Sequence, residues 1–455
     1  MDCRSDNISI GKEVLLMTQH NSGTGNDNQH ANLNKLPDYR LYVDDVDTIK
    51  EACTRDYYIN EPTDARIVEN GIIYPFEVDT NSFPIQAIHE GVYDANGSYI
   101  DGFAIQRRHS MSSSIASAEL HAIAYEDAAV VYGGYIWNHY GHMLTESLSR
   151  MWWFLENPDK RYKYVFTSWD NIIDNYEFFN MLGLRESDIV LLKKPMRFKS
   201  VIVPECAMDR RKVFKDKAVN IYNFLRDSVK PAKYEKIYLT RTKFENNFVN
   251  IIVNEEYFEN YYRSLGYEII SPEQLPIKEQ ISIMAGATKV VCTGGTLHHQ
   301  ILFCQEGIDI TVLIRTEVKK NKTIYFVINQ MRKARCTFID VSMNFLPSRF
   351  NFSCFLLMPT IYWKQYIGEQ AATASDSVSV SIPPHLVLEY IEKWTKMITE
   401  LSPNILKQKY SKFTLADIII SLNKYILGNE LDEPKKKMLF DVFNADSTAT
   451  TPERN

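Results

Sequence analysis

Short apolar runs alternate with segments of helical period along the middle of the chain. Between residues 130 and 228 the runs YKYVFT, DIVLL and VIVPE have the composition of buried strands. A second series extends from KIYLT to ITVLI, and its spacing predicts helices over 254–265, over 276–285 and from Leu297. Strands that alternate with helices are typical of parallel sheets covered by helices. The pattern therefore predicts an α/β fold with two Rossmann-like, doubly wound domains.

The flanking segments have different patterns. Residues 1–35 are polar and offer too little apolar surface to offset the entropy of ordering, which predicts a flexible arm. Turn dipeptides such as Asn96-Gly97 predict strands and hairpins between 39 and 127. The low-complexity stretch over 371–381 predicts a linker.

These boundaries divide the chain into four parts. Two helices are predicted beyond the linker, over 384–401 and 413–427. The predicted parts are a flexible arm over 1–35, a first domain over 36–228, a second domain over 229–345, and a mostly helical extension over 346–455 that packs back on the first domain.

Length, charge and cysteine usage narrow the class of protein. The 455 residues exceed what one core usually holds, and the net charge of -6 argues against a protein that coats nucleic acid. No apolar run approaches the roughly 18–20 residues needed to span a bilayer. The N-terminus has charged residues where an export signal would be apolar, and the seven cysteines form no CxxC pair. We therefore expect a cytoplasmic protein that binds no nucleic acid and has no transmembrane segment.

The densest polar cluster lies in the segment WNHYGHMLTESLSRMWW, residues 137–153. A helix that begins near Gly141 would carry His142, Glu146 and Ser149 on one face, with His139 just before it. A histidine oriented by a carboxylate can serve as a general base near neutral pH.

Other interpretations of this segment stay open. Glu146 could simply pair with His142 or with Arg150, which is also four residues away. The spacing HxxHxxxE could instead supply three metal ligands from His139, His142 and Glu146, although it lacks the HExxH spacing of hydrolytic zinc helices.

A second motif, KVVCTGGTLHHQILF, places Gly294, Gly295 and Thr296 between a buried strand and a helix. Backbone N–H groups at a helix start can bind an anion, and glycine permits its close approach. His298 and His299 add hydrogen-bond donors. An ordinary tight turn is the alternative interpretation.

A third motif, KIYLTRTKF, places Arg241 and Lys243 after the end of a buried strand. Open α/β sheets bind ligands at this edge, and a guanidinium there could neutralise a diphosphate. The alternative is a solvated basic loop.

Together the three motifs resemble glycosyltransferase family 61, which includes plant xylosyl- and arabinosyltransferases, animal N-acetylglucosaminyltransferases and bacterial capsular polysaccharide enzymes. The resemblance covers about residues 130–315. It is carried by four short matches along the chain: Asn138, Gly141, His142 and Glu146; Tyr238, Leu239, Thr240 and Arg241; Asn254-Glu255; and Glu279-Gln280.

The sequence departs from the family pattern in two places. The family's GPHGA loop reads CTGGT here, so Gly294 stands where the family has histidine, and His298 or His299 are the candidates to replace it. The acidic residue common on the next strand of the family is not evident in ITVLIRT.

The resemblance implies a GT-B-like arrangement, in which two Rossmann-like domains face a cleft. It places the acceptor on the first domain and the donor on the second, and it implies inversion at the anomeric carbon with no metal or other cofactor. We therefore predict an inverting hexosyl- or pentosyltransferase that moves a sugar from a nucleotide diphosphate, most simply UDP, to a glycan hydroxyl.

The predicted roles divide the site residues into three groups. Catalysis is assigned to His142, Glu146 and His139; the donor diphosphate to Arg241, Lys243, Gly294, Gly295, Thr296 and His298; and sugar contacts to Asn138 and His299. The predicted setting is capsule or surface polysaccharide synthesis, with peripheral association with an assembly complex at the inner face of the membrane. The alternatives are a metal-dependent hydrolase built on His139, His142 and Glu146, and a catalytically inactive sugar- or nucleotide-binding module.

Overall fold

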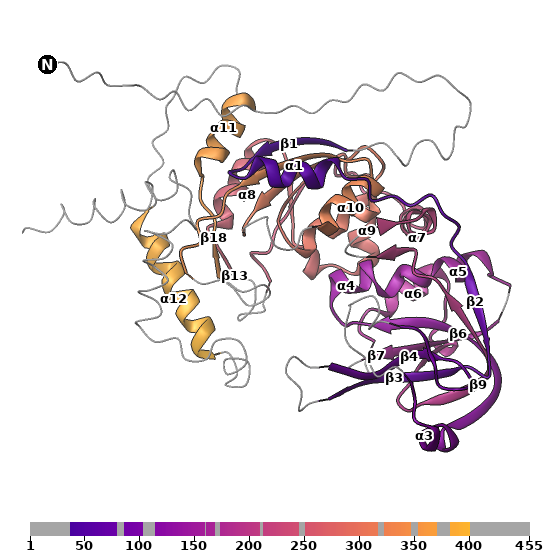
Figure 1. The fold of residues 1–455 in the computed structure, drawn as a ribbon. Helices are drawn as coiled ribbons and strands as arrows, with labels where there is room; N and C mark the ends of the chain where they lie inside the picture. The colour runs from indigo at the N-terminus through magenta and orange to yellow at the C-terminus, as the bar shows by residue number, and fades with distance from the viewer. Residues whose placement is uncertain are drawn as a thin grey trace, which may run out of the picture.

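The computed structural model describes ten segments of the chain (Figure 1), namely residues 37–79, 86–102, 114–159, 161–168, 173–209, 213–244, 251–316, 323–346, 354–370 and 383–400. The predicted arm over 1–35, the linker over 371–381 and the helix over 413–427 lie outside these segments.

The described elements alternate between strands and helices over most of the chain. The strands are β1 (Asp38–Tyr42), β2 (Ala65–Glu69), β3 (Ile72–Asp79), β4 (Gln86–Tyr93), β5 (Tyr99–Asp101), β6 (Ala124–Ile136), β7 (Lys163–Ser168), β8 (Ile189–Leu191), β9 (Met196–Pro204), β10 (Met208–Asp209), β11 (Val213–Phe214), β12 (Lys236–Leu239), β13 (Ile251–Val253), β14 (Glu268–Ile270), β15 (Lys289–Thr293), β16 (Asp309–Ile314), β17 (Arg335–Asp340) and β18 (Cys354–Leu356). The helices are α1 (Val46–Thr54), α3 (Ser117–Ala122), α4 (Tyr140–Thr145), α5 (Trp152–Glu156), α6 (Tyr176–Leu182), α7 (Asp216–Asp227), α8 (Glu255–Ser264), α9 (Ile277–Gly286), α10 (Thr323–Met331), α11 (Ile361–Gln370) and α12 (Pro384–Glu400), with 3-10 helices η1 (Ser147–Arg150), η2 (Glu186–Asp188), η3 (Pro272–Gln274) and η4 (Thr296–Phe303).

A six-stranded parallel sheet forms the core of what we call the second lobe. Its strand order is β1-β17-β16-β15-β12-β14, and every neighbouring pair is parallel. The strands between β12 and β17 alternate with helices, as the sequence predicts. The first strand is the exception to the prediction: β1 was expected in the first domain, but it pairs with β17, and its buried Tyr39 and Leu41 join the core of this lobe.

An eight-stranded sheet forms the core of the first lobe, and it is mixed. Strands β9, β6, β7 and β8 are parallel neighbours. Strands β2 to β5 pair antiparallel at the other edge, where Gly97, with φ of 81°, lies in the turn between β4 and β5. The prediction of a doubly wound parallel sheet is therefore wrong for this lobe, because its hairpins join the same sheet as its βα units.

The described part of the C-terminal extension packs on the second lobe. Helix α11 contacts β1 and β17, and α12 contacts the two-stranded sheet of β13 and β18. Trp363 and Trp394 are fully buried in these contacts. The prediction that the extension returns to the first domain is wrong for α11 and α12, since their apolar faces are covered by the second lobe.

The two lobes meet through helices, with α4 and α6 on one side and α9 and η4 on the other (Figure 1). The Glu177 carboxylate of α6 accepts hydrogen bonds from the first two N–H groups of α9, at 3.0 Å each. Phe178 stacks on Phe303 of η4 at 6.1 Å between ring centroids. One continuous hydrophobic cluster includes residues from both lobes, so the lobes hold each other in a defined arrangement.

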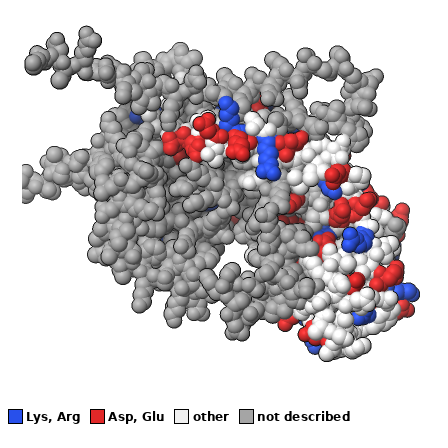
Figure 2. Space-filling model, viewed as in Figure 1, with Lys and Arg blue, Asp and Glu red and all other residues white. Residues whose placement is uncertain are grey.

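The surface of the first lobe carries both signs of charge. In the view of Figure 2, acidic and basic side chains are interspersed over this lobe. Within the described residues, no helix is both long and apolar enough to cross a membrane.

Candidate active site

The candidate base lies on a short helix directly after β6. The chain leaves the sheet at Ile136, and α4 begins at Tyr140. The predicted helix is interrupted at Glu146, which has φ of -131°, and continues as η1 and α5. Ser147 donates a hydrogen bond to the carbonyl of Tyr135 at 3.0 Å, and such side-chain bonds to the backbone compete with helix continuation.

His142 and Glu146 form the pair that their spacing predicts. The distance from His142 Nδ1 to Glu146 Oε1 is 2.8 Å, and the side chains are only 11% and 9% exposed. The ring of His139 meets that of His142 edge-on, with 4.9 Å between ring centroids, and the indole of Trp137 lies 5.2 Å from the His142 ring. His139 itself is exposed, so the buried pair adjoins a surface lined by rings.

Two other polar residues of this segment, Arg150 and Ser149, interact with groups outside the His142–Glu146 pair. Arg150 pairs with Asp101 at 2.8 Å, so it is not the partner of Glu146. Ser149 exchanges hydrogen bonds with the backbone of Met208, at 2.9 and 3.2 Å. Both residues hold η1 in place, and neither joins the candidate base.

The second part of the site lies at the carboxyl edge of the parallel sheet. Strands β12, β15 and β16 are neighbours in the order β16-β15-β12, and all three are parallel. Arg241 follows β12, Gly294 and Gly295 follow β15, and Arg315 follows β16. Three adjacent strand ends thus bring two arginines and a glycine turn to one edge, where α/β sheets bind ligands.

The glycine turn is shaped by close contact with Arg315. Gly295 has φ of 126°, which favours glycine, and an ideal Cβ on it would lie 2.6 Å from Nη2 of Arg315. The Gly294 N–H donates to the carbonyl of Leu313 at 2.8 Å, and the Gly295 N–H donates to the hydroxyl of Tyr325. The expectation that both glycine amides point at an anion is therefore wrong, because both already have acceptors.

The two arginines are desolvated and repel each other. Arg315 is 7% exposed and stacks on Phe355 at 4.5 Å. Burial and the like charge of Arg241 hold the pKa of Arg315 below its ordinary value, and burial also lowers the pKa of Arg241. Nε of Arg241 has no hydrogen-bond partner among the described residues. An anion between these groups would relieve both effects.

Glu255 is a buried carboxyl group beside this pair. It accepts hydrogen bonds from the Tyr238 hydroxyl at 3.4 Å and from the Arg241 N–H at 3.2 Å. Burial raises the pKa of Glu255 to about 8. A carboxyl group that keeps its proton near neutral pH contributes little negative charge to the two guanidinium ions.

Arg315 is the residue that sequence reasoning missed. In the motif ITVLIRT an arginine comes directly after a buried strand, which is the same signal that selected Arg241. Only the knowledge that β16 lies next to β15 places that arginine at the glycine turn.

The histidines of η4 have different surroundings from those expected. His298 is fully buried, its Nε2 lies 2.9 Å from Oδ1 of Asn329, and burial lowers its pKa to about 4. A neutral, enclosed imidazole brings no charge to a phosphate. His299 lies at the contact between the lobes, beside Gly141.

Two other predicted site residues lie outside η4. Lys243 is exposed, and Oδ1 of Asn138 accepts a hydrogen bond from the backbone N–H of Asp174 at 3.1 Å.

Gly141 and Thr296 bring the candidate base next to the turn that contacts Arg315. An ideal Cβ on Gly141 would lie 2.9 Å from Nδ1 of His299 and 3.0 Å from Cγ2 of Thr296. Gly141 precedes His142, and Thr296 follows Gly295. The structure therefore places the His142 helix directly against the turn that contacts Arg315.

This close approach predicts a cost for any side chain at residue 141. Gly141→Ala should destabilise the protein by about 1–3 kcal/mol, because the added methyl group overfills the contact between the lobes. Urea denaturation would measure the change. Gly368→Ala is the control, since nothing lies within 4 Å of its ideal Cβ in α11, and replacing a helical glycine by alanine should stabilise by up to about 1 kcal/mol. Equal stability of both variants would contradict the tight contact.

A metal centre built on the His142 segment finds no support in the geometry. Among the residues that the structure describes, no group of three or more His, Cys, Asp or Glu side chains is arranged to hold a metal ion.

Comparison with known protein families matches part of the chain to a glycosyltransferase family. Residues 140–314 match the family described as Glycosyltransferase 61. This segment begins at α4 and ends with β16, so it contains the His142–Glu146 pair, Arg241 and the glycine turn, and Arg315 follows it directly. A search of curated proteins found no match to the chain. The family match supports the resemblance inferred from the motifs, and glycosyltransferase is the activity that it indicates.

Proposed function

We propose that the protein is an inverting, metal-independent glycosyltransferase that transfers a sugar from a UDP-linked donor to a glycan hydroxyl. The donor diphosphate binds at the edge formed by Arg241, Gly295 and Arg315. The acceptor binds on the first lobe beside His142, so the two lobes act as the halves of a GT-B-like enzyme. The observation that carries this proposal is a buried arginine, Arg315, that is repelled by the half-buried Arg241 and lies next to the His142 helix.

The chemistry follows from the charges at each position. With a proton on Nδ1 donated to Glu146, His142 accepts the proton of the acceptor hydroxyl at Nε2. The acceptor oxygen forms a bond to the anomeric carbon as the bond from that carbon to the diphosphate breaks. A single displacement of this kind inverts the anomeric centre. The negative charge that develops on the leaving UDP is stabilised by the two guanidinium ions and by the first amides of η4.

This assignment revises the predicted donor contacts. Arg241 keeps its role, Arg315 is added, and Thr296 contributes from the start of η4. His298 becomes a support for Tyr325, whose ring lies 4.4 Å from it. A role in capsule or surface polysaccharide synthesis is the biological setting that we propose.

The first test is binding of the nucleotide product. UDP should raise the free energy of unfolding by up to about 2.7 kcal/mol at a hundredfold excess over its dissociation constant. Thermal denaturation with and without UDP would measure this, with uridine as the control because it lacks the diphosphate. No stabilisation by UDP or by any other nucleoside diphosphate would contradict the donor site.

A second measurement separates an enzyme from an inactive binding module. A transferase should hydrolyse its sugar donor slowly without acceptor, releasing UDP, whereas a binding module should release none. Incubation with a panel of UDP-sugars and assay of free UDP would distinguish the two. The same panel identifies the sugar.

A further inference from the structure

An exposed tryptophan lies directly beside the buried candidate base. Trp137 is 37% exposed, whereas the other four tryptophans whose exposure the structure gives are at most 7% exposed. Burying an apolar ring is favourable, so an exposed ring beside a polar site gains free energy when a ligand covers it. Trp137 is therefore a candidate for ligand contact.

The position of this ring is fixed by the backbone around it. The Trp137 N–H donates to Oγ of Ser147 at 3.4 Å, and its carbonyl accepts from the His139 N–H at 2.7 Å. Tyr135 lies against the indole at 5.8 Å between ring centroids. The hydrogen bonds thus hold the backbone of Trp137 between the end of β6 and the start of α4, and Tyr135 supports the indole, as a rigid platform requires.

Trp137 and two histidines form a continuous aromatic surface. The indole lies 5.2 Å from the His142 ring with an angle of 39°, and the His139 ring lies 4.9 Å from the His142 ring with an angle of 70°. Trp137 and His139 are exposed, whereas His142 is buried against Glu146. A molecule lying on the indole would therefore have its edge next to the imidazole that removes a proton.

We propose that Trp137 is the stacking platform for a pyranose ring of the acceptor, which makes the acceptor a glycan. This inference rests on the proposed function. A pyranose has an apolar face of C–H bonds and a rim of hydroxyl groups, so it can cover the indole while directing one hydroxyl to His142. A small aliphatic alcohol or the hydroxyl of a peptide serine has no face of this size to cover the ring.

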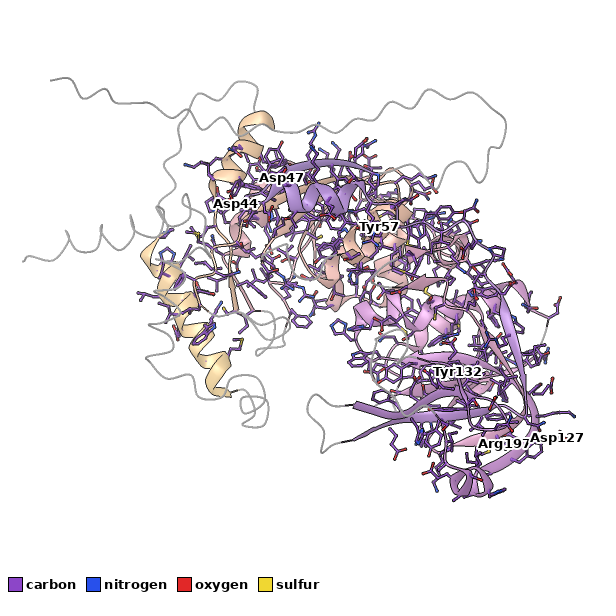
Figure 3. The ribbon with its side chains drawn as sticks, viewed as in Figure 1. Asp44, Asp47, Tyr57, Asp127, Tyr132 and Arg197 are labelled. Carbon is purple, nitrogen blue, oxygen red and sulfur yellow. The ribbon has the colours of Figure 1, made fainter. Side chains whose placement is uncertain are left out.

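The test compares Trp137→Ala with Trp137→Phe and with a matched control. Tyr125→Ala is the control, because Tyr125 lies near the start of β6, the strand that Trp137 follows, and is 52% exposed. Its hydroxyl donates a hydrogen bond to Asp127, which lies at the outer end of the first lobe in Figure 3. The acceptor probes are methyl pyranosides and short oligosaccharides, with glycerol and a serine-containing peptide as non-sugar hydroxyls. UDP affinity is measured by calorimetry for every variant.

The expected result is a change confined to the acceptor. Trp137→Ala should raise the KM for the saccharide acceptor about tenfold or more, Trp137→Phe should recover most of this loss, and Tyr125→Ala should match the wild type. UDP affinity should stay within about twofold in all three, since no donor contact changes.

Three outcomes would overturn the platform while leaving the transferase intact. The first is an unchanged acceptor KM in Trp137→Ala. The second is a loss of UDP affinity in this variant, which would place the nucleotide on the indole. The third is a wild-type enzyme that hydrolyses its donor but transfers only to non-sugar hydroxyls. A wild type that binds no nucleoside diphosphate would instead refute the proposed function itself.

Discussion

Replacement of His142 by Ala should reduce turnover by about a hundredfold to ten-thousandfold while UDP binds as tightly as before. The loss follows because the Glu146 carboxylate orients the His142 imidazole, whereas the proposed donor site lies on the other lobe. Initial rates at saturating donor and acceptor, with UDP affinity from calorimetry, would give both quantities. The two readouts separate loss of a base from loss of fold.

The carboxylate partner and a surface histidine are the controls for this experiment. Glu146→Gln keeps the shape of the pair but removes the charge that stabilises the imidazolium, so it should reduce turnover by a smaller factor than the loss of the imidazole. His121→Ala changes an exposed histidine on α3 of the same lobe and should leave the rate unchanged. Full activity of His142→Ala would assign the base to Glu146 or His139.

Local pattern predicted the parts of this site that depend on local spacing. His142 and Glu146 are four residues apart on one helical turn, so their contact follows from helix geometry alone. The location of Arg241 at a strand end follows similarly from the apolar run before it. In both cases the information lies within a short stretch of the chain.

The features that sequence reasoning missed depend on partners far away in the chain. Strand β1 has an ordinary alternating pattern, but nothing in that pattern selects the distant β17 as its neighbour. Helix α4 ends before Glu146, where Ser147 donates a hydrogen bond to the carbonyl of Tyr135 in β6, a bond that competes with helix continuation. Such contacts exist only once the fold has brought the segments together.

The hydrogen bonds of the glycine turn also depend on distant residues that the sequence motif does not indicate. Two glycines before a helix resemble an anion-binding loop, yet the hydroxyl of Tyr325 occupies one amide and a strand carbonyl the other. The glycines instead allow the close approach of Arg315. The sequence predicts a phosphate site at this edge of the sheet and assigns part of the binding to the glycine amides. In the structure these amides are hydrogen-bonded to other groups, and the guanidinium of Arg315 lies against the turn.

This second guanidinium leads to the other large expected effect. Arg315→Met should weaken UDP binding by about 2–5 kcal/mol, or about 30-fold at the least, because it removes one of the two guanidinium ions of the proposed diphosphate site. Methionine keeps an apolar stem against Phe355, so the packing below the site is preserved. Calorimetric titration with UDP would measure the loss, and Arg315→Lys should bind with intermediate affinity because lysine keeps the charge but not the planar fork.

Stability should move in the opposite direction from binding in this variant. Arg315 is desolvated and repelled by Arg241, so without ligand its charge costs free energy that an uncharged methionine side chain would not. The free energy of unfolding of Arg315→Met without UDP should therefore equal or exceed that of the wild type, measured by urea denaturation. Arg335→Ala is the matched control, because this arginine is exposed, pairs with Asp309 at the amino end of the same sheet, and should leave UDP affinity unchanged. If Arg315→Met instead unfolded more easily and bound UDP normally, the arginine would be a structural residue, and the diphosphate would have to be held by Arg241 and the start of η4.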